Sequence, residues 1–233
     1  MSAPCLVIAH RGAWGAAAPG NPAENTLEAF EAAIELGADM IEFDVRRTSD
    51  GQLIVFHDAR VNRMPTGSLP YETLRVKGTQ SRPPLLTDVL ALTKDRIALN
   101  LEFKEAGYVE EAIALLHAFG LERCLVSSFL DEVVREAKAL APQLRTGLLV
   151  RAGVRRALTL RLPAAHADCL CLHRRLADAA ALSSAAAAGV PCVIWTVNAP
   201  RAMNRYLRHP TVEGVITDRP ALALARRAMI RRV

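Results

Sequence analysis

Short runs of apolar residues alternate with stretches of helical periodicity along the chain. Nine runs have the length and composition of buried strands, and they span residues 6–9, 40–45, 53–57, 97–103, 124–127, 146–150, 169–172, 193–197 and 214–217. Apolar residues recur at helical spacing in residues 26–36, 86–93, 109–119, 131–140, 176–188 and 199–207. This alternation predicts a parallel sheet covered by helices, and eight strands favour closure into a single-domain TIM-type (β/α)8 barrel. A doubly wound open sheet is the alternative.

The first predicted helix carries ordinary boundary signals. Asn25 or Thr26 can cap its N-terminus, and Glu28 in the first turn favours the helix dipole. Gly37 lies just past its end, where a left-handed residue terminates helices at little cost.

The turn at Asp50-Gly51 joins two strand-like runs. If it closes a plain two-residue hairpin, Asp44 lies opposite His57. If the two runs are instead parallel barrel strands, residues 46–52 cross over without a helix and both side chains lie at the same barrel end. Both alternatives bring Asp44 and His57 together.

The region after these runs breaks the alternation. Residues 62–84 hold four prolines and two glycines and show little periodicity, which predicts an irregular excursion over a barrel face. We therefore expect one barrel domain over residues 1–233, with a short irregular insertion after the third strand at about residues 59–85.

Composition narrows the function classes. Hydrophobic residues make up 51% of the 233 residues and charged residues 23%, which is typical of a globular domain. The net charge of +5 suits a phosphate-bearing ligand, but a merely solvated surface is the simpler interpretation. The arginine clusters in residues 151–161, 174–175 and 226–232 have no interleaved aromatics, so we expect no nucleic-acid partner.

The cysteines and the N-terminus give further exclusions. The five cysteines lack zinc-finger spacing, and Cys169 and Cys171 would share one face of a strand, where core packing is expected. The N-terminus has no basic region of a signal peptide, and no run reaches 18 apolar residues. These features predict a cytoplasmic protein without stable membrane insertion.

Three carboxylates occupy strand-like runs. Glu42 and Asp44 are two residues apart and point the same way, and Glu102 shares a face with Asn100 and Lys104. Inward-facing carboxylates in an apolar strand are costly unless a cation or a donor satisfies them. Oxygen ligands of this kind favour Mg²⁺ or Ca²⁺, so we predict that Glu42, Asp44 and Glu102 bind a divalent metal.

Basic groups accompany the carboxylates. His10 and His57 each end an apolar run and form a plausible acid–base pair, because imidazole titrates near neutral pH. Arg11 offers a planar fork that matches phosphate oxygens, and Lys104 adds a positive charge for an anionic transition state. Gly12 either lets the backbone approach a ligand or forms a plain turn. The set indicates a phosphodiester-cleaving metal site.

Short motifs follow one another in a fixed order along nearly the whole chain. They are H-R-G at 10–12, E-N-T-L at 24–27, E-F-D-V at 42–45, T-x-D-G at 48–51, V-F-H-D at 55–58, L-N-L-E-F-K at 99–104, S-S-F at 127–129, W-T-V-N at 195–198 and G-V-I-T-D-R-P at 214–220. This ordered set resembles the glycerophosphodiester phosphodiesterase family. The resemblance implies a TIM-type barrel and hydrolysis of a small-molecule glycerophosphodiester to an alcohol and sn-glycerol 3-phosphate.

The resemblance also implies roles for matched residues. It makes His10 and His57 the acid–base pair, and it places the metal on the three carboxylates already named. Arg11 and Lys104 would contact the phosphate. Trp195 would pack beside the glycerol end of the substrate, although a core role is equally compatible with the sequence. Glu24 would join the site unless helix capping explains its motif.

Two departures from the family pattern lie near this site. The turn that usually reads arginine-threonine-threonine-glycine is replaced by V-N-R-M-P-T-G at 61–67, and the excursion ends early, near Leu85. Ala23 stands where a proline often precedes the E-N-T motif. The shortened excursion bears on the headgroup preference, and neither change removes a predicted catalytic group.

Three other functions share parts of this pattern. A sphingomyelinase D-like or phospholipase C-like enzyme would use the same barrel and metal site, but it needs a membrane-binding surface. A phosphate-ligand binding barrel with weak catalysis would retain only the binding groups. Metal-using sugar isomerases occur on the same barrel and would be expected to use histidine as a metal ligand.

Overall fold

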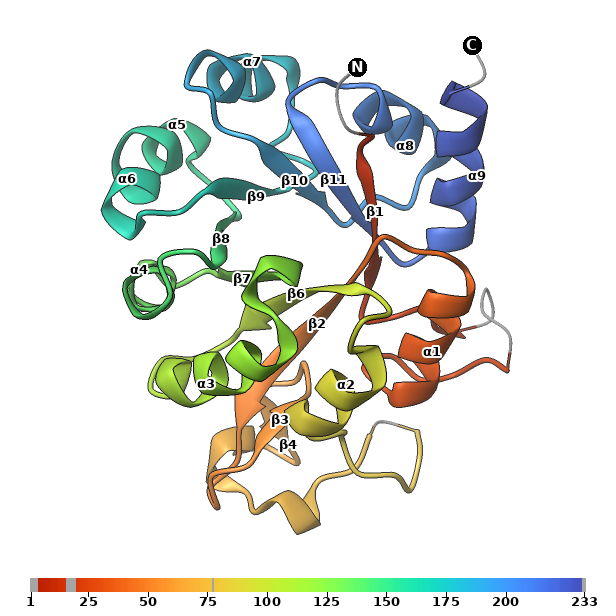
Figure 1. The fold of residues 1–233 in the computed structure, drawn as a ribbon, viewed down its shortest axis with the longest axis vertical. Coiled ribbons are helices and arrows are strands. Elements are labelled where there is room, and N and C mark those ends of the chain that lie inside the picture. The colour runs from red at the N-terminus through yellow and green to blue at the C-terminus, as the bar shows by residue number, and fades with distance from the viewer. Residues whose placement is uncertain (1–3, 16–19, 77, 232–233) are drawn as a thin grey trace.

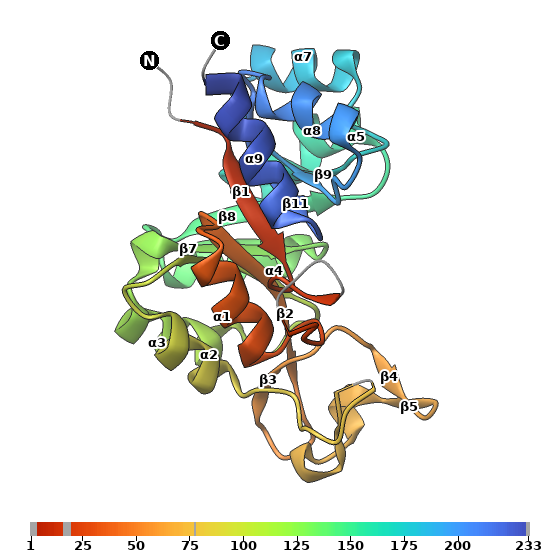
Figure 2. The same cartoon turned by 90° about the vertical axis from the view of Figure 1, so that its right-hand side faces the viewer.

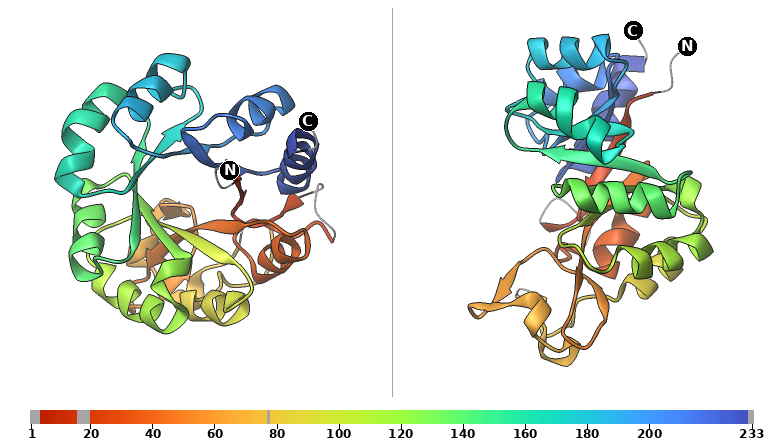
Figure 3. Two further views of the ribbon diagram at one scale, coloured as in Figure 1. Left: turned by 45° about the horizontal axis from the view of Figure 1, so that its top comes forward. Right: turned by 90° about the vertical axis from the view of Figure 1, so that its left-hand side faces the viewer.

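Eight parallel strands form a closed barrel with helices around it (Figures 1 and 3). The computed structural model describes residues 4–15, 20–76 and 78–231. The ring closes because β1 pairs with both β2 and β11. The barrel strands are β1 (Leu6–His10), β2 (Met40–Arg47), β6 (Ala98–Phe103), β7 (Cys124–Ser128), β8 (Arg145–Val150), β9 (Cys169–His173), β10 (Cys192–Trp195) and β11 (Val212–Thr217). The predicted barrel is confirmed, and the open doubly wound sheet is excluded.

Six helices fall where the periodicity predicts them. They are α1 (Leu27–Glu35), α2 (Leu86–Thr93), α3 (Val109–Phe119), α4 (Asp131–Leu140), α7 (Ala179–Ala187) and α8 (Pro200–Leu207). The helix predicted over residues 176–188 begins later because Asp178 caps it, accepting the N–H of Ala181 at 2.8 Å. Among the described residues, no helix combines the length and the apolar character needed to cross a membrane.

Two helical segments were not among the predicted helices. The first is a continuous run of α5 (Val154–Arg156), the π-helix η5 (Ala157–Arg161) and α6 (Leu162–Ala165). Its arginines and the proline at position 163 obscure any apolar stripe. The second is α9 (Pro220–Arg231), the arginine-rich tail. One short 3-10 turn, η4 (Leu121–Arg123), links α3 to β7.

The third apolar run is not a barrel strand. Only β3 (Leu53–Val55) is extended, and it pairs antiparallel with the end of β2, so the eighth barrel strand is β11. A five-residue loop closes the turn, with the N–H of Thr48 bonded to the carbonyl of Gln52 at 3.0 Å. Because this loop is longer than a two-residue hairpin, Asp44 bonds to Phe56 across the strands, and the predicted opposition of Asp44 and His57 is wrong by one residue.

An irregular segment follows β3 and projects from one end of the barrel (Figure 2). It contains β4 (Arg60–Val61), β5 (Met64–Pro65), η2 (Thr66–Ser68) and η3 (Tyr71–Thr73). A small cluster of Ile54, Phe56 and Leu74 packs under it, and the chain returns through a bridge between Ile54 and Leu85. This segment corresponds to the excursion that the sequence predicts.

The interior of the barrel is filled by side chains from alternate strand positions. Cys169 and Cys171 both lie in this cluster with Ile8, Leu149 and Val193, and all five cysteines of the chain are buried and free. The predicted packing role of the two thiols on one strand face is therefore confirmed. These side chains fill the barrel below its mouth, so its interior is a packed core.

Candidate active site

The carboxyl ends of neighbouring strands bring the predicted site residues to one end of the barrel. His10 is the last residue of β1 and lies opposite Glu42 of β2, while Asp44 lies opposite Glu102 of β6. Alternate residues of a strand share a face, so Glu42 and Asp44 point the same way. Lys104 follows the last residue of β6. Three adjacent barrel strands thus supply an imidazole, three carboxylates and an ammonium group.

The three carboxylates form a buried cluster. Glu42, Asp44 and Glu102 each offer an oxygen within 4.8 Å of the others. The Lys104 ammonium lies 2.7 Å from Oδ1 of Asp44 and 2.5 Å from Oε1 of Glu102. Oε2 of Glu42 is buried and has no hydrogen-bond partner among the residues described. Since a buried carboxylate oxygen without a donor is costly, this all-oxygen set fits a hard divalent cation.

The environment separates the acidities of the three carboxyl groups. Burial raises the pKa of Glu42 to about 7, although the neighbouring His10 acts to lower it. Burial acts to raise the pKa of Asp44 too, but Lys104 and Arg11 outweigh it and hold that pKa at about 2. Burial likewise raises the pKa of Glu102, against the lowering influence of Lys104. Asp44 is therefore anionic near neutral pH, and a bound cation would hold Glu42 ionised.

His10 is oriented by a carboxylate from the far end of the chain. Its Nδ1 lies 2.5 Å from Oδ1 of Asp218, which directly follows β11. Asn198 donates its side-chain amide to Asp218 and accepts the N–H of Asp218 at 3.0 Å. Burial acts to lower the pKa of His10, but the carboxylates of Glu42 and Asp218 outweigh it and raise that pKa. The other ring nitrogen of His10, Nε2, lies 3.8 Å from Oε2 of Glu42, a member of the carboxylate cluster.

Arg11 reaches the cluster from a left-handed backbone. Its φ is 57°, its N–H donates to the carbonyl of Glu42 at 2.6 Å, and its Nε lies 3.3 Å from Oδ2 of Asp44. Nη1 donates to Oε1 of Glu24 at 2.7 Å, which brings Glu24 into the site. The guanidinium is thus fixed beside the carboxylates of Asp44 and Glu24.

Residues of the E-N-T motif contact both helix α1 and the carboxylate cluster. Thr26 caps α1 by accepting the N–H of Ala29, whereas Asn25 donates its side-chain amide to Oδ2 of Asp44 at 2.8 Å. Gly12 is required for packing on the same helix, because a Cβ there would lie 2.7 Å from the carbonyl oxygen of Ala29. Its close contact is therefore with α1.

His57 comes from the segment after β3 and is more accessible than His10. Its side chain is 40% exposed, against 18% for His10. Nδ1 lies 3.0 Å from Oδ1 of Asp58. The buried side chain of Arg46 on β2 holds the backbone carbonyl of His57 through Nε and Nη2, at 3.1 and 3.0 Å. The two histidines therefore reach the barrel mouth from separate elements.

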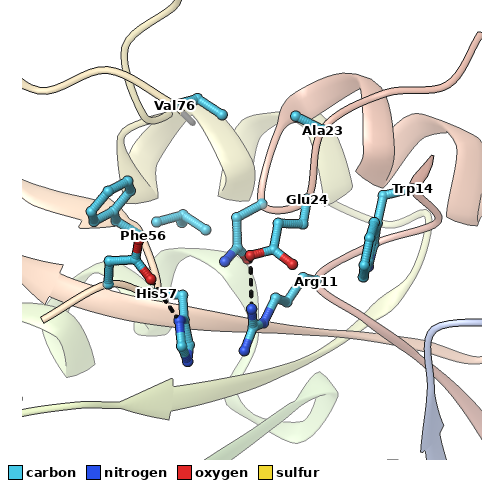
Figure 4. A pocket seen from close by; sticks show the side chains of 10 residues that line it. Arg11, Trp14, Ala23, Glu24, Phe56, His57 and Val76 are labelled. Atoms are coloured by element: carbon cyan, nitrogen blue, oxygen red, sulfur yellow. Dashed lines mark hydrogen bonds and ion pairs between the residues drawn. The ribbon is translucent and has the colours of Figure 1, made fainter. Parts of the chain in front are cut away.

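One cavity of about 360 Å³ lies between the loop after β1 and the segment after β3. Figure 4 shows Trp14 and Phe56 on opposite sides of it, with the Arg11–Glu24 ion pair between them and His57 below. Both carboxylates on this side, Glu24 and Asp58, already have a basic partner.

A larger cavity of about 650 Å³ opens on the other side of the cluster. Trp195 lines it together with His10, His57, Glu102 and Lys104. The indole N–H donates to the carbonyl of Cys171 at 2.9 Å, which fixes the ring in the cavity wall. All eight predicted site residues thus lie at one end of the barrel, seven around the carboxylates and Trp195 beside them.

Sequence reasoning assigned no role to three residues that support the site. Asp218 and Asn198 lie in the motifs G-V-I-T-D-R-P and W-T-V-N, and Arg46 follows E-F-D-V. Each is a polar residue at or near the end of an apolar run, which is the signal that could have marked them. Their partners lie elsewhere in the sequence, and Asp218 is 208 residues from His10.

Comparison with known proteins agrees with this geometry. The model of the "Glycerophosphoryl diester phosphodiesterase family" matches residues 10–222. The chain is 32% identical over 240 residues to a glycerophosphodiester phosphodiesterase of Caldanaerobacter subterraneus subsp. tengcongensis, covering 92% of this chain and 94% of the relative.

Solved structures share the whole barrel. A phosphodiesterase of Oleispira antarctica, in complex with the product sn-glycerol-3-phosphate, matches with a TM-score of 0.81 and 27% identity over 96% of each chain. A glycerophosphodiester phosphodiesterase of Parabacteroides distasonis matches with a TM-score of 0.82, covering 99% of this chain and 100% of the other. Its identity of 23% supports likeness of fold.

Proposed function

The chain belongs to the glycerophosphoryl diester phosphodiesterase family, and on that premise we propose that it hydrolyses glycerophosphodiesters to an alcohol and sn-glycerol 3-phosphate. The observation that carries this proposal is the buried cluster of Glu42, Asp44 and Glu102 at the mouth of the barrel, flanked by two histidines. The Oleispira antarctica relative bound to sn-glycerol-3-phosphate supports the same product.

The three carboxylates would hold a divalent ion, Mg²⁺ or Ca²⁺. The fit rests on Oε2 of Glu42, which is buried without a donor, and on the purely carboxylate donor set. When bound, such an ion neutralises the charge that develops on a phosphoryl oxygen. Lys104 and Arg11 hold the pKa of Asp44 well below its usual range, so one anionic ligand is present near neutral pH.

Arg11 and Lys104 would hold the other phosphoryl oxygens. Arg11 presents a planar set of donors beside Asp44, and Lys104 lies between Asp44 and Glu102. Both side chains are mostly buried, so their charges act on the phosphate with little screening by water.

His10 and His57 would carry the proton transfers. One imidazole takes a proton from the nucleophile and the other gives one to the leaving alkoxide. In each ring Nδ1 is hydrogen-bonded to a carboxylate, that of Asp218 or of Asp58, and Nε2 makes no hydrogen bond among the residues described, so Nε2 would carry the proton transfer. The nucleophile is either water or a neighbouring hydroxyl of the substrate, the latter through a cyclic phosphate.

Trp195 would bind the glycerol end of the substrate. Its indole is fixed by the carbonyl of Cys171 and presents an apolar face to the larger cavity.

We further propose that residues 1–233 work as one barrel domain with the insertion at about residues 59–85, on a small-molecule substrate in the cytoplasm. The five free buried thiols are compatible with a reducing compartment.

The test is a coupled assay of glycerol 3-phosphate release from glycerophosphocholine, -ethanolamine, -inositol and -glycerol, with EDTA and after addition of each metal. Release should require a divalent ion and should fall by orders of magnitude in His10→Ala and in His57→Ala. The melting temperature of each variant shows whether its fold is retained. Near-normal release in either histidine variant, or full release in EDTA, would refute the mechanism.

A further inference from the structure

Two arginines on the wall of the larger cavity have no carboxylate partner. Arg151 and Arg175 both line the cavity of about 650 Å³. Neither guanidinium takes part in an ion pair or a side-chain hydrogen bond to an acid within residues 4–15, 20–76 and 78–231. By contrast, Arg161, a few residues away along the chain, is paired with Asp131 at 2.6 Å. Unpaired guanidinium groups in a cavity are suited to an anionic ligand.

The barrel topology places both arginines at the mouth. Arg151 directly follows β8, and Arg175 lies two residues after the end of β9. These strands are parallel neighbours, with Val150 opposite Leu172, so their carboxyl ends meet at the same edge. Carboxyl ends of barrel strands carry the functional groups of such folds. The two positive charges therefore face the same space as the catalytic cluster.

Arg151 is held against an aromatic platform. Its guanidinium carbon lies 4.0 Å from the centre of the Phe129 ring, and Phe129 packs edge-on against Trp195 with ring centres 5.7 Å apart. A stacked guanidinium keeps its donors in the plane of the group and loses little entropy when it binds an anion. Arg151 also lines an adjoining cavity of about 480 Å³ that reaches His57 and Ala59.

The other cations of the reaction centre already contact acidic side chains. Arg11 and Lys104 contact carboxylates of the cluster, and Glu24 and Asp58 each contact a basic partner. The wall that carries the two free arginines contributes no carboxylate to the larger cavity, whose one acid, Glu102, is paired with Lys104. Within the described part of the chain, the cations of the larger cavity that have no acidic partner are therefore Arg151 and Arg175, and both lie on the same wall.

We infer that this side of the mouth binds a second anionic group of the substrate, so that the enzyme prefers glycerophosphodiesters that carry a phosphomonoester beyond the scissile phosphate. The inference rests on the proposed phosphodiesterase activity and refines its substrate class. A cavity of about 650 Å³ has room for such a group in addition to the glycerol beside Trp195. Arg151 and Arg175 supply planar donors that match phosphate oxygens.

The experiment compares two substrates that differ by one phosphate, glycerophosphoinositol and glycerophosphoinositol 4-phosphate. We expect kcat/KM to be about tenfold higher for the phosphorylated diester, and the ratio to fall as salt is raised. The double variant Arg151→Gln/Arg175→Gln should bring the ratio close to one. Arg174→Gln removes one equal charge from the next residue, which does not line the cavity, and should retain the ratio.

Equilibrium binding of the same two compounds in EDTA separates this inference from the proposed function. Tighter binding of the phosphorylated compound that is lost in the double variant supports the inference even if no diester is hydrolysed. The inference is overturned if the native protein hydrolyses or binds the phosphorylated and unphosphorylated compounds equally well. It is also overturned if the double variant keeps the preference for the phosphorylated compound. A preference for glycerophosphocholine, whose headgroup is cationic, also overturns it.

Discussion

Replacement of Asp218 by asparagine tests whether His10 works in the orientation that the structure gives it. The carboxylate lies 2.5 Å from Nδ1 of His10, and both side chains are mostly buried, at 27% and 18% exposure. A hydrogen bond to a charged group contributes about 1.5–3 kcal/mol. Because each 1.36 kcal/mol is tenfold in rate, Asp218→Asn should lower kcat by about 10- to 150-fold.

The assay is steady-state release of glycerol 3-phosphate across a pH series. Asp218 raises the pKa of His10, so the limb of the pH profile that reports His10 should move to lower pH in the variant. KM should change little, because Asp218 does not line the larger cavity. The melting temperature shows whether the fold is retained.

Thr217→Val is the matched control for this variant. Thr217 donates to Oδ1 of Asn198 at 3.1 Å, so its loss disturbs the same network without removing the carboxylate from His10. We expect less than a threefold change in kcat for this control. A kcat within twofold of the native value in Asp218→Asn, with an unmoved pH profile, would refute the positioning role.

Three further predictions concern stability. Burial raises the pKa of Glu42 to about 7, so between about pH 5 and pH 7 the native state keeps a proton that the unfolded chain has released. The melting temperature in EDTA should therefore decrease as the pH is raised from about 5 to about 7. Glu42→Gln should flatten this slope, and an equally steep slope in that variant would contradict the assignment. Lys104→Met leaves the buried carboxylates without their ammonium partner and should make the melting temperature depend more strongly on Mg²⁺ or Ca²⁺, as thermal denaturation with and without EDTA would report. Gly147→Ala puts a Cβ 2.8 Å from Sγ of Cys171 inside the barrel, so overpacking should cost about 1–3 kcal/mol, measured by denaturant unfolding, and Cys171→Ala should restore it. If the unfolding free energy of Gly147→Ala equals that of the native protein, the barrel interior accommodates the added methyl group and the reasoning is wrong.

Periodicity along the chain was sufficient to predict the barrel and the carboxylate cluster. All eight barrel strands coincide with apolar runs of strand length, and Glu42, Asp44 and Glu102 stand out because they interrupt such runs. Strand geometry alone then requires Glu42 and Asp44 to share a face. Local pattern suffices for these features because they depend on residues one or two positions apart.

The features that local pattern did not give depend on distant contacts or on loop geometry. The third apolar run resembles a barrel strand, and only the five-residue loop around Asp50 makes it an antiparallel neighbour of β2. The pairing of His10 with Asp218 joins the first and last barrel strands, and it exists only because the ring closes. The helical run through α5 and α6 carries too many arginines to show an apolar stripe.

His10 and His57 are anchored to different parts of the fold. His10 belongs to β1 and therefore to the closed barrel. His57 lies in the irregular segment after β3, where the guanidinium of Arg46 holds its backbone carbonyl. The spacing of the two imidazoles therefore depends on how the irregular segment after β3 is held as well as on the closed barrel. A change in that segment would alter this spacing while the barrel core keeps its packing.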